Sequence, residues 1–319
     1  MPGIHLRPAE LERDFGLLAE LFTLEQDEPT TESGLIEDYE VHKDRIFCLT
    51  VAEDESGEFL GFNWATLNRD SARKAYFYVI VQPEHRLKGV GSWLYQDVEQ
   101  SARAAGVDQL EVGIRDDRPE CRAFAERRGF SEHLHRIGMR LNLDAFDDHP
   151  YDELIARLED GGFLFTSMSE LGDTNEARRR LYRLNDTTAA QTMGADGDHP
   201  WSDFEDFQKH VCQAEWYQPG GQKVAIDVAS GEWAAMSAIT CFASRDYAYN
   251  LFTGVDERYR GRKLGQAVKV TALRYAREVL GVHEVRTHHN TNNLPMLAID
   301  RKFGYEVLPG EFVMIRSLI

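Results

Sequence analysis

Two segments of this 319-residue chain read alike, and this repeat constrains the fold more than any other feature of the sequence. Residues 81–112 and 255–285 each pass from a β-prone run through an arginine- and glycine-containing loop into a helical pattern. The landmarks that repeat are Arg86 with Arg260, 174 residues apart, and Gly129 with Gly304, 175 residues apart. Solenoid repeats have periods of about 20–50 residues, so a repeat this long predicts two domains of one type.

The chain is long enough for two domains that each bury a core, since domains commonly hold about 100–200 residues. An acidic, proline-containing stretch over residues 144–150 separates the halves. We therefore expect an N-terminal domain over residues 1–145, a linker over 146–161 and a C-terminal domain over 162–319. Each half reads strand, helices, antiparallel strands, helix, strand, helix, strand, which predicts an α/β fold with a mixed sheet in each domain.

The periodicity of apolar residues places the individual elements. Helices are expected over residues 10–23, 33–42, 89–105, 120–128, 151–159 and 174–184, and within 199–214. Strands are expected over residues 4–7, 47–52, 59–65, 76–81, 110–114, 136–143 and 163–167, and near 224, 235 and 247. The strand over 136–143 is expected to close the sheet of the first half.

Charge limits the classes of partner. The formal net charge is −18, which disfavours nucleic acid because phosphate contacts need clustered Lys and Arg. The same charge favours a cationic substrate, although an acidic surface kept for solubility explains it equally well. The sequence has no secretory signal pattern and no apolar run long enough to span a membrane, so we expect a cytoplasmic protein without a membrane partner.

The loop from Arg86 to Gly91 is the most specific single feature, since it follows a β run and opens a helix. Glycines permit close backbone approach, and the first N–H groups of a helix lack partners within the helix. Those donors and the positive helix end suit a phosphate or pyrophosphate, and Arg86 and Lys88 can add charge. The loop lacks the GK[ST] ending of the P-loop and the third glycine of the dinucleotide fingerprint. A plain turn is the alternative.

The pattern R-x-x-G-x-G, preceded by V-x-P and followed about forty residues later by a helix ending in Gly-Phe, resembles the acetyl-CoA-binding core of the GNAT superfamily. In the first half these elements are Val81–Pro83, Arg86–Gly91 and Gly129–Phe130. In the second half they are Val255, Arg260–Gly265 and Gly304–Tyr305, and the stretch over residues 290–297 is similar to the family's asparagine-containing turn. The chain thus resembles a tandem GNAT N-acetyltransferase with two GNAT folds, a layout also found in mycothiol synthases.

The resemblance implies that acetyl-CoA is the cofactor and that its acetyl group is transferred directly to an amine. In the first half the implied cofactor-binding residues are Ile80, Val81, Arg86, Leu87, Lys88, Gly89, Val90, Gly91 and Ser92. In the second half they are Gly254, Val255, Arg260, Gly261, Arg262, Lys263, Leu264, Gly265, Gln266 and Asn293. Strand residues would pair with the pantetheine arm, a backbone N–H would polarise the thioester, and a base or water chain would take the amine proton.

The sequence departs from the family pattern in places that matter for chemistry. Lys263 occupies the first glycine position of the second loop, where it either crowds the pyrophosphate or adds charge to it. The tyrosine that often protonates the departing thiolate in GNAT enzymes is missing, because Ala125 and Asp300 stand at that position. Arg118 and Asn293 stand at the asparagine position.

The candidate catalytic residues are Tyr249 and Asp300, both in the second half. Tyr249 would relay a proton or shape the acceptor pocket, with packing as its alternative. Asp300 would need a raised pKa to act as an acid, and its alternative is a place on a helix surface. His288 and His289 stand at the end of a strand near the expected site, and either histidine is a candidate base. Adjacent residues of a strand face opposite sides of the sheet, so only one of them can face the site. No spacing typical of metal ligands accompanies them.

Two aromatic groups are candidates for the active site. The first comprises His199, Trp201, Phe204 and Phe207, which would line an acceptor pocket, and the stretch over residues 186–203 is expected to cover an acceptor site. The second comprises Tyr76 and Tyr78, which alternate on one strand, so face one side, and would lie beside the thioester. Core packing is the alternative for both groups.

These features predict an enzyme that transfers an acetyl group from acetyl-CoA to a primary amine of a small molecule, with a cationic molecule favoured by the charge. A binding module with one or both domains degenerate is the alternative, because of the absent tyrosines and Lys263. A tandem GNAT transferase that uses aminoacyl-tRNA is a third possibility, which the negative charge opposes. The chain is expected to be a monomer or a homodimer.

Overall fold

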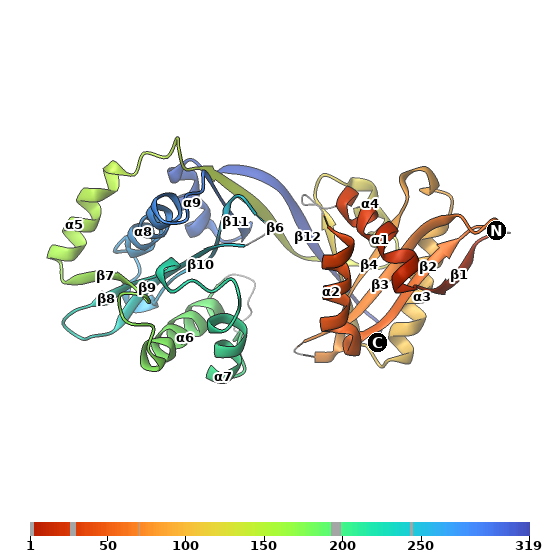
Figure 1. The fold of residues 1–319 in the computed structure, drawn as a ribbon, viewed down its shortest axis with the longest axis horizontal. Helices are drawn as coiled ribbons and strands as arrows, with labels where there is room; N and C mark the ends of the chain where they lie inside the picture. The colour runs from red at the N-terminus through yellow and green to blue at the C-terminus, as the bar shows by residue number, and fades with distance from the viewer. Residues whose placement is uncertain (1–2, 26–29, 70, 193–198, 243–244) are drawn as a thin grey trace. The chain divides into compact units, whose positions relative to one another are not determined.

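The computed structural model describes residues 3–25, 30–69, 71–192, 199–242 and 245–319. The chain forms two compact units: the first comprises residues 1–133 with 312–319, and the second comprises residues 134–311. Each unit is a mixed sheet with helices on its faces (Figure 1). The expected fold class is therefore confirmed.

In the first unit the strands lie in the order β1-β2-β3-β4-β5-β12, with β4 and β5 parallel. The strands are β1 (His5–Pro8), β2 (Ile46–Glu53), β3 (Phe59–Asn68), β4 (Ser71–Val81), β5 (Gln109–Arg115) and β12 (Glu306–Ser317). The helices are α1 (Leu11–Glu25), α2 (Glu32–His42), α3 (Val90–Ala104) and α4 (Pro119–Glu126).

In the second unit the order is β12-β6-β11-β10-β9-β8-β7, with β10 and β11 parallel. The strands are β6 (Ser131–Asn142), β7 (Phe163–Ser167), β8 (Gln222–Asp227), β9 (Trp233–Cys241), β10 (Ala248–Val255) and β11 (Glu284–Asn290). The helices are α5 (Asp152–Asp160), α6 (Asn175–Ala190), α7 (Phe204–Phe207), α8 (Leu264–Glu278) and α9 (Leu294–Phe303). None of the described helices is both long and apolar enough to cross a bilayer.

Two strands pass from one unit to the other. β6 starts in the first unit and continues into the second, where residues 136–142 pair with β11, whereas β12 starts in the second unit and ends in the first. The expectation that residues 136–143 close the first half is therefore wrong. Strands pair through backbone groups that every residue shares, so apolar alternation identifies a buried face but not a partner strand. The domain bounds at residues 145 and 162 remain a prediction.

The helices of the first unit cover opposite faces of its sheet. Phe15 and Phe22 of α1 pack with Phe62 and Trp64 of β3 in one core. On the other face, α3 contributes Leu94 to one buried cluster and Tyr95 and Val98 to another. This alternation along each strand follows from the two-residue period of a β-strand.

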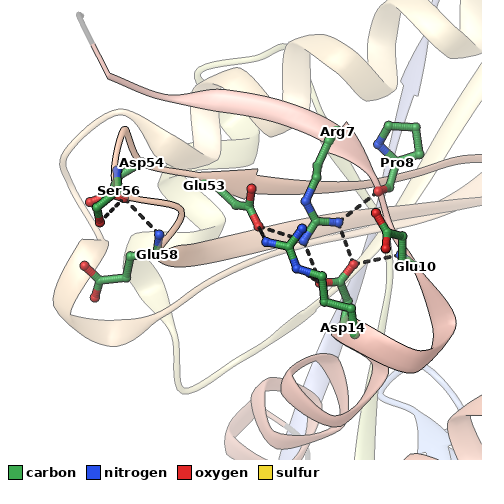
Figure 2. Close-up of polar contacts among 9 residues, drawn as sticks. Arg7, Pro8, Glu10, Asp14, Glu53, Asp54, Ser56 and Glu58 are labelled. Carbon is green, nitrogen blue, oxygen red and sulfur yellow. Dashed lines mark hydrogen bonds and ion pairs between the residues drawn. The ribbon is translucent and has the colours of Figure 1, made fainter.

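Arg7 of β1 connects the start of the chain to α1 and β2 through hydrogen bonds (Figure 2). Its guanidinium donates to both carboxylate oxygens of Asp14 on α1, at 2.6 and 2.7 Å, and to Glu53 Oε1 on β2 at 2.7 Å. Asp14 is buried and also accepts the Glu10 N–H at 2.7 Å. In the turn expected between β2 and β3, Asp54 Oδ1 accepts the N–H groups of Ser56 and Glu58.

Candidate active site

The loops that open α3 and α8 each present a run of unpaired backbone donors. Among the described residues, no hydrogen-bond acceptor lies opposite the N–H groups of residues 87–91 or of residues 261–265. The next N–H in each helix returns to the loop: Ser92 donates to the Gly89 carbonyl at 3.0 Å, and Gln266 to that of Lys263 at 3.1 Å. Unpaired donors at the positive end of a helix form an anion site.

Both loops enter the left-handed backbone region at two equivalent positions. In the first loop these are Leu87, with φ of 60°, and Gly89, with φ of 92°. In the second they are Gly261, with φ of 80°, and Lys263, with φ of 67°. Each loop thus has glycine at one position and a side chain at the other, in opposite order. Strained backbone of this kind persists where the surrounding structure requires it.

The arginine of each loop braces the loop instead of facing its donors. Arg86 Nε donates to the Val81 carbonyl at 3.0 Å, and its guanidinium pairs with Glu25 at the end of α1. Arg260 Nε donates to the Val255 carbonyl at 3.2 Å, and its guanidinium bonds the side-chain oxygen of Gln191. The expectation that Arg86 adds charge to a phosphate finds no support here, because its guanidinium is already engaged.

In each unit a parallel strand pair opens next to the loop. Pairing of β4 with β5 covers residues 74–76, and pairing of β10 with β11 covers residues 248–249, among the described residues. Beyond these points β4 and β10 present a free edge that contains Ile80, Val81, Gly254 and Val255. A free strand edge can bind an extended ligand through backbone hydrogen bonds. The register of β10 is further interrupted by a bulge between Asn250 and Phe252.

Tyr76 and Tyr249 occupy equivalent places, since each is the last paired residue before its strand edge becomes free. Tyr76 hydroxyl accepts the Gly113 N–H at 3.0 Å. Tyr249 hydroxyl lies 2.5 Å from His288 Nδ1. Loss of water around the ring, and the charges of Arg136 and His289, lower the pKa of His288 to about 4. His288 is therefore neutral at pH 7 and can accept the Tyr249 proton in a hydrogen bond.

The other histidine of β11 belongs to a buried charged cluster on the opposite face, which we call the α8–α9 triad: Lys269, His289 and Asp300. Lys269 Nζ contacts Asp300 Oδ1, and His289 Nε2 lies 2.6 Å from Asp300 Oδ2. Lys269 and Asp300 are both 0% exposed. The expected alternative of a helix-surface aspartate is therefore wrong, because α9 turns this residue toward α8 and not toward solvent.

Asp300 is also unsuited to donate a proton itself. Burial alone would raise its pKa, but the charge of Lys269 and the hydrogen bond with His289 outweigh burial and lower the pKa. The raised pKa that an acid role required is absent. In the first unit the equivalent positions are apolar or aromatic: Tyr95, Ile114 and Ala125, all in one hydrophobic cluster.

Sequence reasoning missed Lys269, which the helical period could have revealed. It falls between Gly265 and Leu273 at four-residue spacing, on the apolar stripe of α8. A charge on such a stripe needs a buried partner. The bracing residues Glu25 and Gln191 had no sequence signal, because they are distant in the chain from the loops they hold.

The remaining sequence candidates have structural places of their own. Asn293 caps α9, since its side-chain oxygen accepts the Met296 N–H at 3.4 Å, and Arg118 precedes α4 without a side-chain cap. Gly254 lies against α6, where a Cβ would approach Thr188 Oγ1 to 2.4 Å. The loop residues Arg262 and Lys263 are exposed, whereas Leu264 is buried.

Of the two aromatic groups, one forms core and the other lines a cavity. Phe207 is buried in the α6–α7 core with Trp201 packed against it, and Phe204 is buried with its ring against Tyr182 of α6. His199 Nδ1 lies 2.6 Å from Asp186 Oδ2. Part of the stretch expected to cover an acceptor, residues 193–198, lies outside the described residues. In the first unit Tyr76 and Tyr78 line a cavity of about 360 Å³. Its other lining side chains include Phe22, Trp64 and Asp38.

Comparison with known proteins bears on both halves. Residues 15–130 match the acetyltransferase (GNAT) family, and residues 151–288 match the acetyltransferase (GNAT) domain. The chain is 25% identical over 270 residues to the mycothiol acetyltransferase of Saccharomonospora viridis, which covers 82% of this chain and 81% of that protein.

Two solved structures share the fold over almost the whole chain. The GCN5-related N-acetyltransferase from Sphaerobacter thermophilus has a TM-score of 0.75 at 19% identity, covering 98% of this chain and 95% of that one. A tandem GNAT protein from the clavulanic acid biosynthesis pathway has a TM-score of 0.66 at 18% identity, covering 98% of both chains. The chain is a member of the GNAT acetyltransferases with two GNAT domains in tandem.

Proposed function

We propose that this tandem GNAT acetyltransferase transfers the acetyl group of acetyl-CoA to a primary amine of a small molecule by direct attack. The observation that carries the proposal is the run of five N–H groups in each loop that have no acceptor within the described part of the chain, next to a free strand edge. A pyrophosphate needs several donors at one place, and an extended arm needs a strand edge. The two features lie in the order in which acetyl-CoA presents those parts.

The residues present fit acetyl-CoA, which brings the activated thioester. The N–H groups of residues 87–91 or 261–265 would hold the pyrophosphate, with Lys88 or Lys263 adding charge from exposed positions. The edges at Ile80–Val81 and Gly254–Val255 would hold the pantetheine arm. Orientation of the amine against a fixed thioester accounts for a large part of the rate enhancement in such reactions.

A cationic amine is the acceptor class that we propose. The chain carries a formal charge of −18, which attracts cations at long range. The cavity beside Tyr76 lies in the first unit and combines aromatic faces and the Asp38 carboxylate with the Arg45 guanidinium, so it adds no preference of its own for a cation. Polyamines and amino sugars belong to this class.

The second unit is the one that we propose to turn over. It has a polar pair on each face of the open strand edge, Tyr249 with His288 and His289 with Asp300, so both proton transfers have candidate groups. Tyr249 is proposed to pass the amine proton toward solvent. The alternative, a binding unit without turnover, applies best to the first unit, where Tyr76 hydroxyl already bonds Gly113 and Ala125 has no proton to give.

The test is calorimetric titration with acetyl-CoA of a matched pair of variants, Ser92→Glu and Gln266→Glu. Both positions are third in their helices, where glutamate favours the helix, but a carboxylate repels a pyrophosphate. Gln266→Glu is nearly isosteric, and Ser92→Gln is the neutral control for the first loop.

Each glutamate is expected to weaken binding at its own loop by tenfold or more. Two sites in the wild type, each removed by one variant, mean that both loops bind. Loss in one variant alone identifies the loop that works. Release of free thiol with a panel of polyamines and amino sugars then tests transfer. Absence of acetyl-CoA binding by the folded wild type refutes the proposal.

A further inference from the structure

We propose that His289, held by Asp300 and Lys269, is the acid that protonates the sulfur of the departing CoA in the second unit. This inference rests on the acetyl-transfer function proposed above. His289 is the proposed catalytic residue, and Asp300 and Lys269 are positioning residues that act through it.

The first argument is position. His289 lies three residues beyond Arg286, the last residue of β11 paired with β10, so it stands beside the free edge of β10. Its side chain turns to the face of α8 and α9, because Asp300 of α9 bonds its ring. The anion-binding loop opens α8 on that same face. The pantetheine arm of a CoA molecule that runs from this loop along the β10 edge therefore passes His289.

The second argument is the state of the ring. Asp300 Oδ2 engages Nε2 at 2.6 Å and holds the imidazole in one orientation. Among the described residues no group bonds Nδ1, and the side chain keeps 11% exposure. With Nε2–H donated to this carboxylate, the second N–H of a protonated ring stands on Nδ1 and faces the open edge.

The third argument is that the α8–α9 triad is costly as a purely structural device. The first unit builds the same place from Tyr95, Ile114 and Ala125, so the fold does not need charges there. Buried ion pairs often stabilise no better than apolar residues of similar size. The second unit has a charged cluster in that place, next to an open strand edge where a proton donor is useful.

The chemical step balances without any further reactant. The neutral amine nitrogen bonds the acetyl carbon, the carbon–sulfur bond breaks, and its electron pair leaves with sulfur. The Nδ1 proton of His289 passes to that sulfur and yields the CoA thiol. The proton lost by the amine goes to solvent, and the neutral imidazole takes a proton from solvent before the next turnover.

Several charged or titratable groups lie close to His289: Asp300 on α9, Lys269 on α8, and His288 next to it on the same strand. Tyr305, which follows α9, places its ring 4.8 Å from Lys269 Nζ, and its buried hydroxyl has no hydrogen-bond partner among the described residues.

The test measures the ionisation of bound CoA, because this needs no knowledge of the acceptor. CoA is bound to the full chain, with the Ser92→Glu substitution as background so that the first loop does not contribute. The ultraviolet absorbance of the thiolate is then followed against pH in the presence and absence of the His289→Gln substitution. Tyr305→Phe, which removes a buried hydroxyl beside the triad, is the control for a structural effect.

A protonated His289 should stabilise the thiolate, so bound CoA should ionise at least one pH unit below free CoA in the background protein and in the Tyr305→Phe control. His289→Gln should abolish this shift while CoA still binds within about threefold. With an active acceptor, kcat should fall about 10²–10⁴-fold and the KM for acetyl-CoA should hardly change. Asp300→Asn should give an intermediate shift, and it replaces His289→Gln if that variant does not fold.

The outcomes separate the two proposals. Failure of the background protein to bind CoA at the second loop refutes acetyl transfer in the second unit. Binding without any shift of the thiol ionisation, or a shift that persists without His289, overturns the role of His289 and leaves the proposed function intact.

Discussion

Lys263 offers the sharpest test of how the second loop is built. Its backbone conformation should lower the stability of the fold, whereas its charge should strengthen the binding of acetyl-CoA. Its φ of 67° lies in the left-handed region, where Gly89 stands in the first loop. Its side chain is exposed and makes no hydrogen bond within the described residues. Replacing Lys263 by glycine therefore removes backbone strain and one positive charge, and little else.

The size of the stability effect follows from two opposing terms. A side chain in the left-handed region costs about 1–2 kcal/mol relative to glycine. Glycine loses more chain entropy on folding, which costs about 0.5–1 kcal/mol. Lys263→Gly should therefore raise the free energy of unfolding by about 0.5–1 kcal/mol. Leu87→Gly should do the same in the first loop, where Leu87 is 100% exposed and loses no packing.

Binding should move the other way in one variant only. Lys263→Gly should lower the affinity of the second loop for acetyl-CoA severalfold, since a charge beside a pyrophosphate is lost, whereas Leu87→Gly leaves the charge unchanged. Lys263→Ala is the control that removes the charge and keeps the Cβ. It should lose the same affinity without the gain in stability.

Urea unfolding followed by circular dichroism measures the first effect, and calorimetry with acetyl-CoA measures the second. A Lys263→Gly protein less stable than the wild type would refute the strain argument. A gain in affinity would mean that the lysine crowds the pyrophosphate instead of binding it.

Three further predictions concern the second unit. Asp300→Ala should destabilise the protein by about 3–5 kcal/mol, because it leaves Lys269 buried without its anion. The triple variant with the first unit's residues, Lys269→Tyr with His289→Ile and Asp300→Ala, should recover most of the lost stability in urea unfolding. Without such a recovery, the corresponding places in the two units would not be equivalent. The pKa of His288 is lowered from 6.5 to about 4, so the unfolded chain binds more protons between these values and stability should rise with pH across that window. His288→Gln should flatten this rise in pH-dependent thermal unfolding, and an unchanged slope would contradict the lowered pKa. Burial raises the pKa of Asp148, but hydrogen bonds from Arg277 and Arg274 outweigh burial, and the net pKa is lowered. The ionised Asp148 therefore contributes to the free energy of unfolding above the ordinary aspartate pKa, and this contribution is lost as the pH falls below that range. Asp148→Asn should be less stable than the wild type at pH 7, and the two stabilities should converge in acid.

The fold and part of the site could be predicted from the sequence for identifiable reasons. The spacing of Arg86 and Arg260 predicted a duplicated unit, and the helical period predicted α1 and α3 to within two residues at each end. The loop pattern predicted an anion site at the start of α3, because glycine content and a following helix are local properties. Such features depend on neighbours in the chain, and the sequence displays them directly.

The α8–α9 triad required distant residues to meet. Asp300 could not be separated from a surface aspartate by its own neighbours, because its environment is provided by Lys269 and His289. The same holds for Arg86, whose engagement with Glu25 depends on where α1 ends. Electrostatic partners are chosen by distance in space, and this distance exists only once the sheet and its helices have assembled.

The sequence by itself thus determined the duplication, the secondary structure and the two loops, since each is encoded in short-range pattern. Only the tertiary structure decided that residues 136–142 pair with β11 and that the end of β12 joins the first unit. The backbone donors and acceptors of any strand are the same, so pairing is selected by the packing of whole sheets. For a charged residue on an apolar stripe, such as Lys269, the partner that neutralises its charge is likewise decided only by the packing of distant elements.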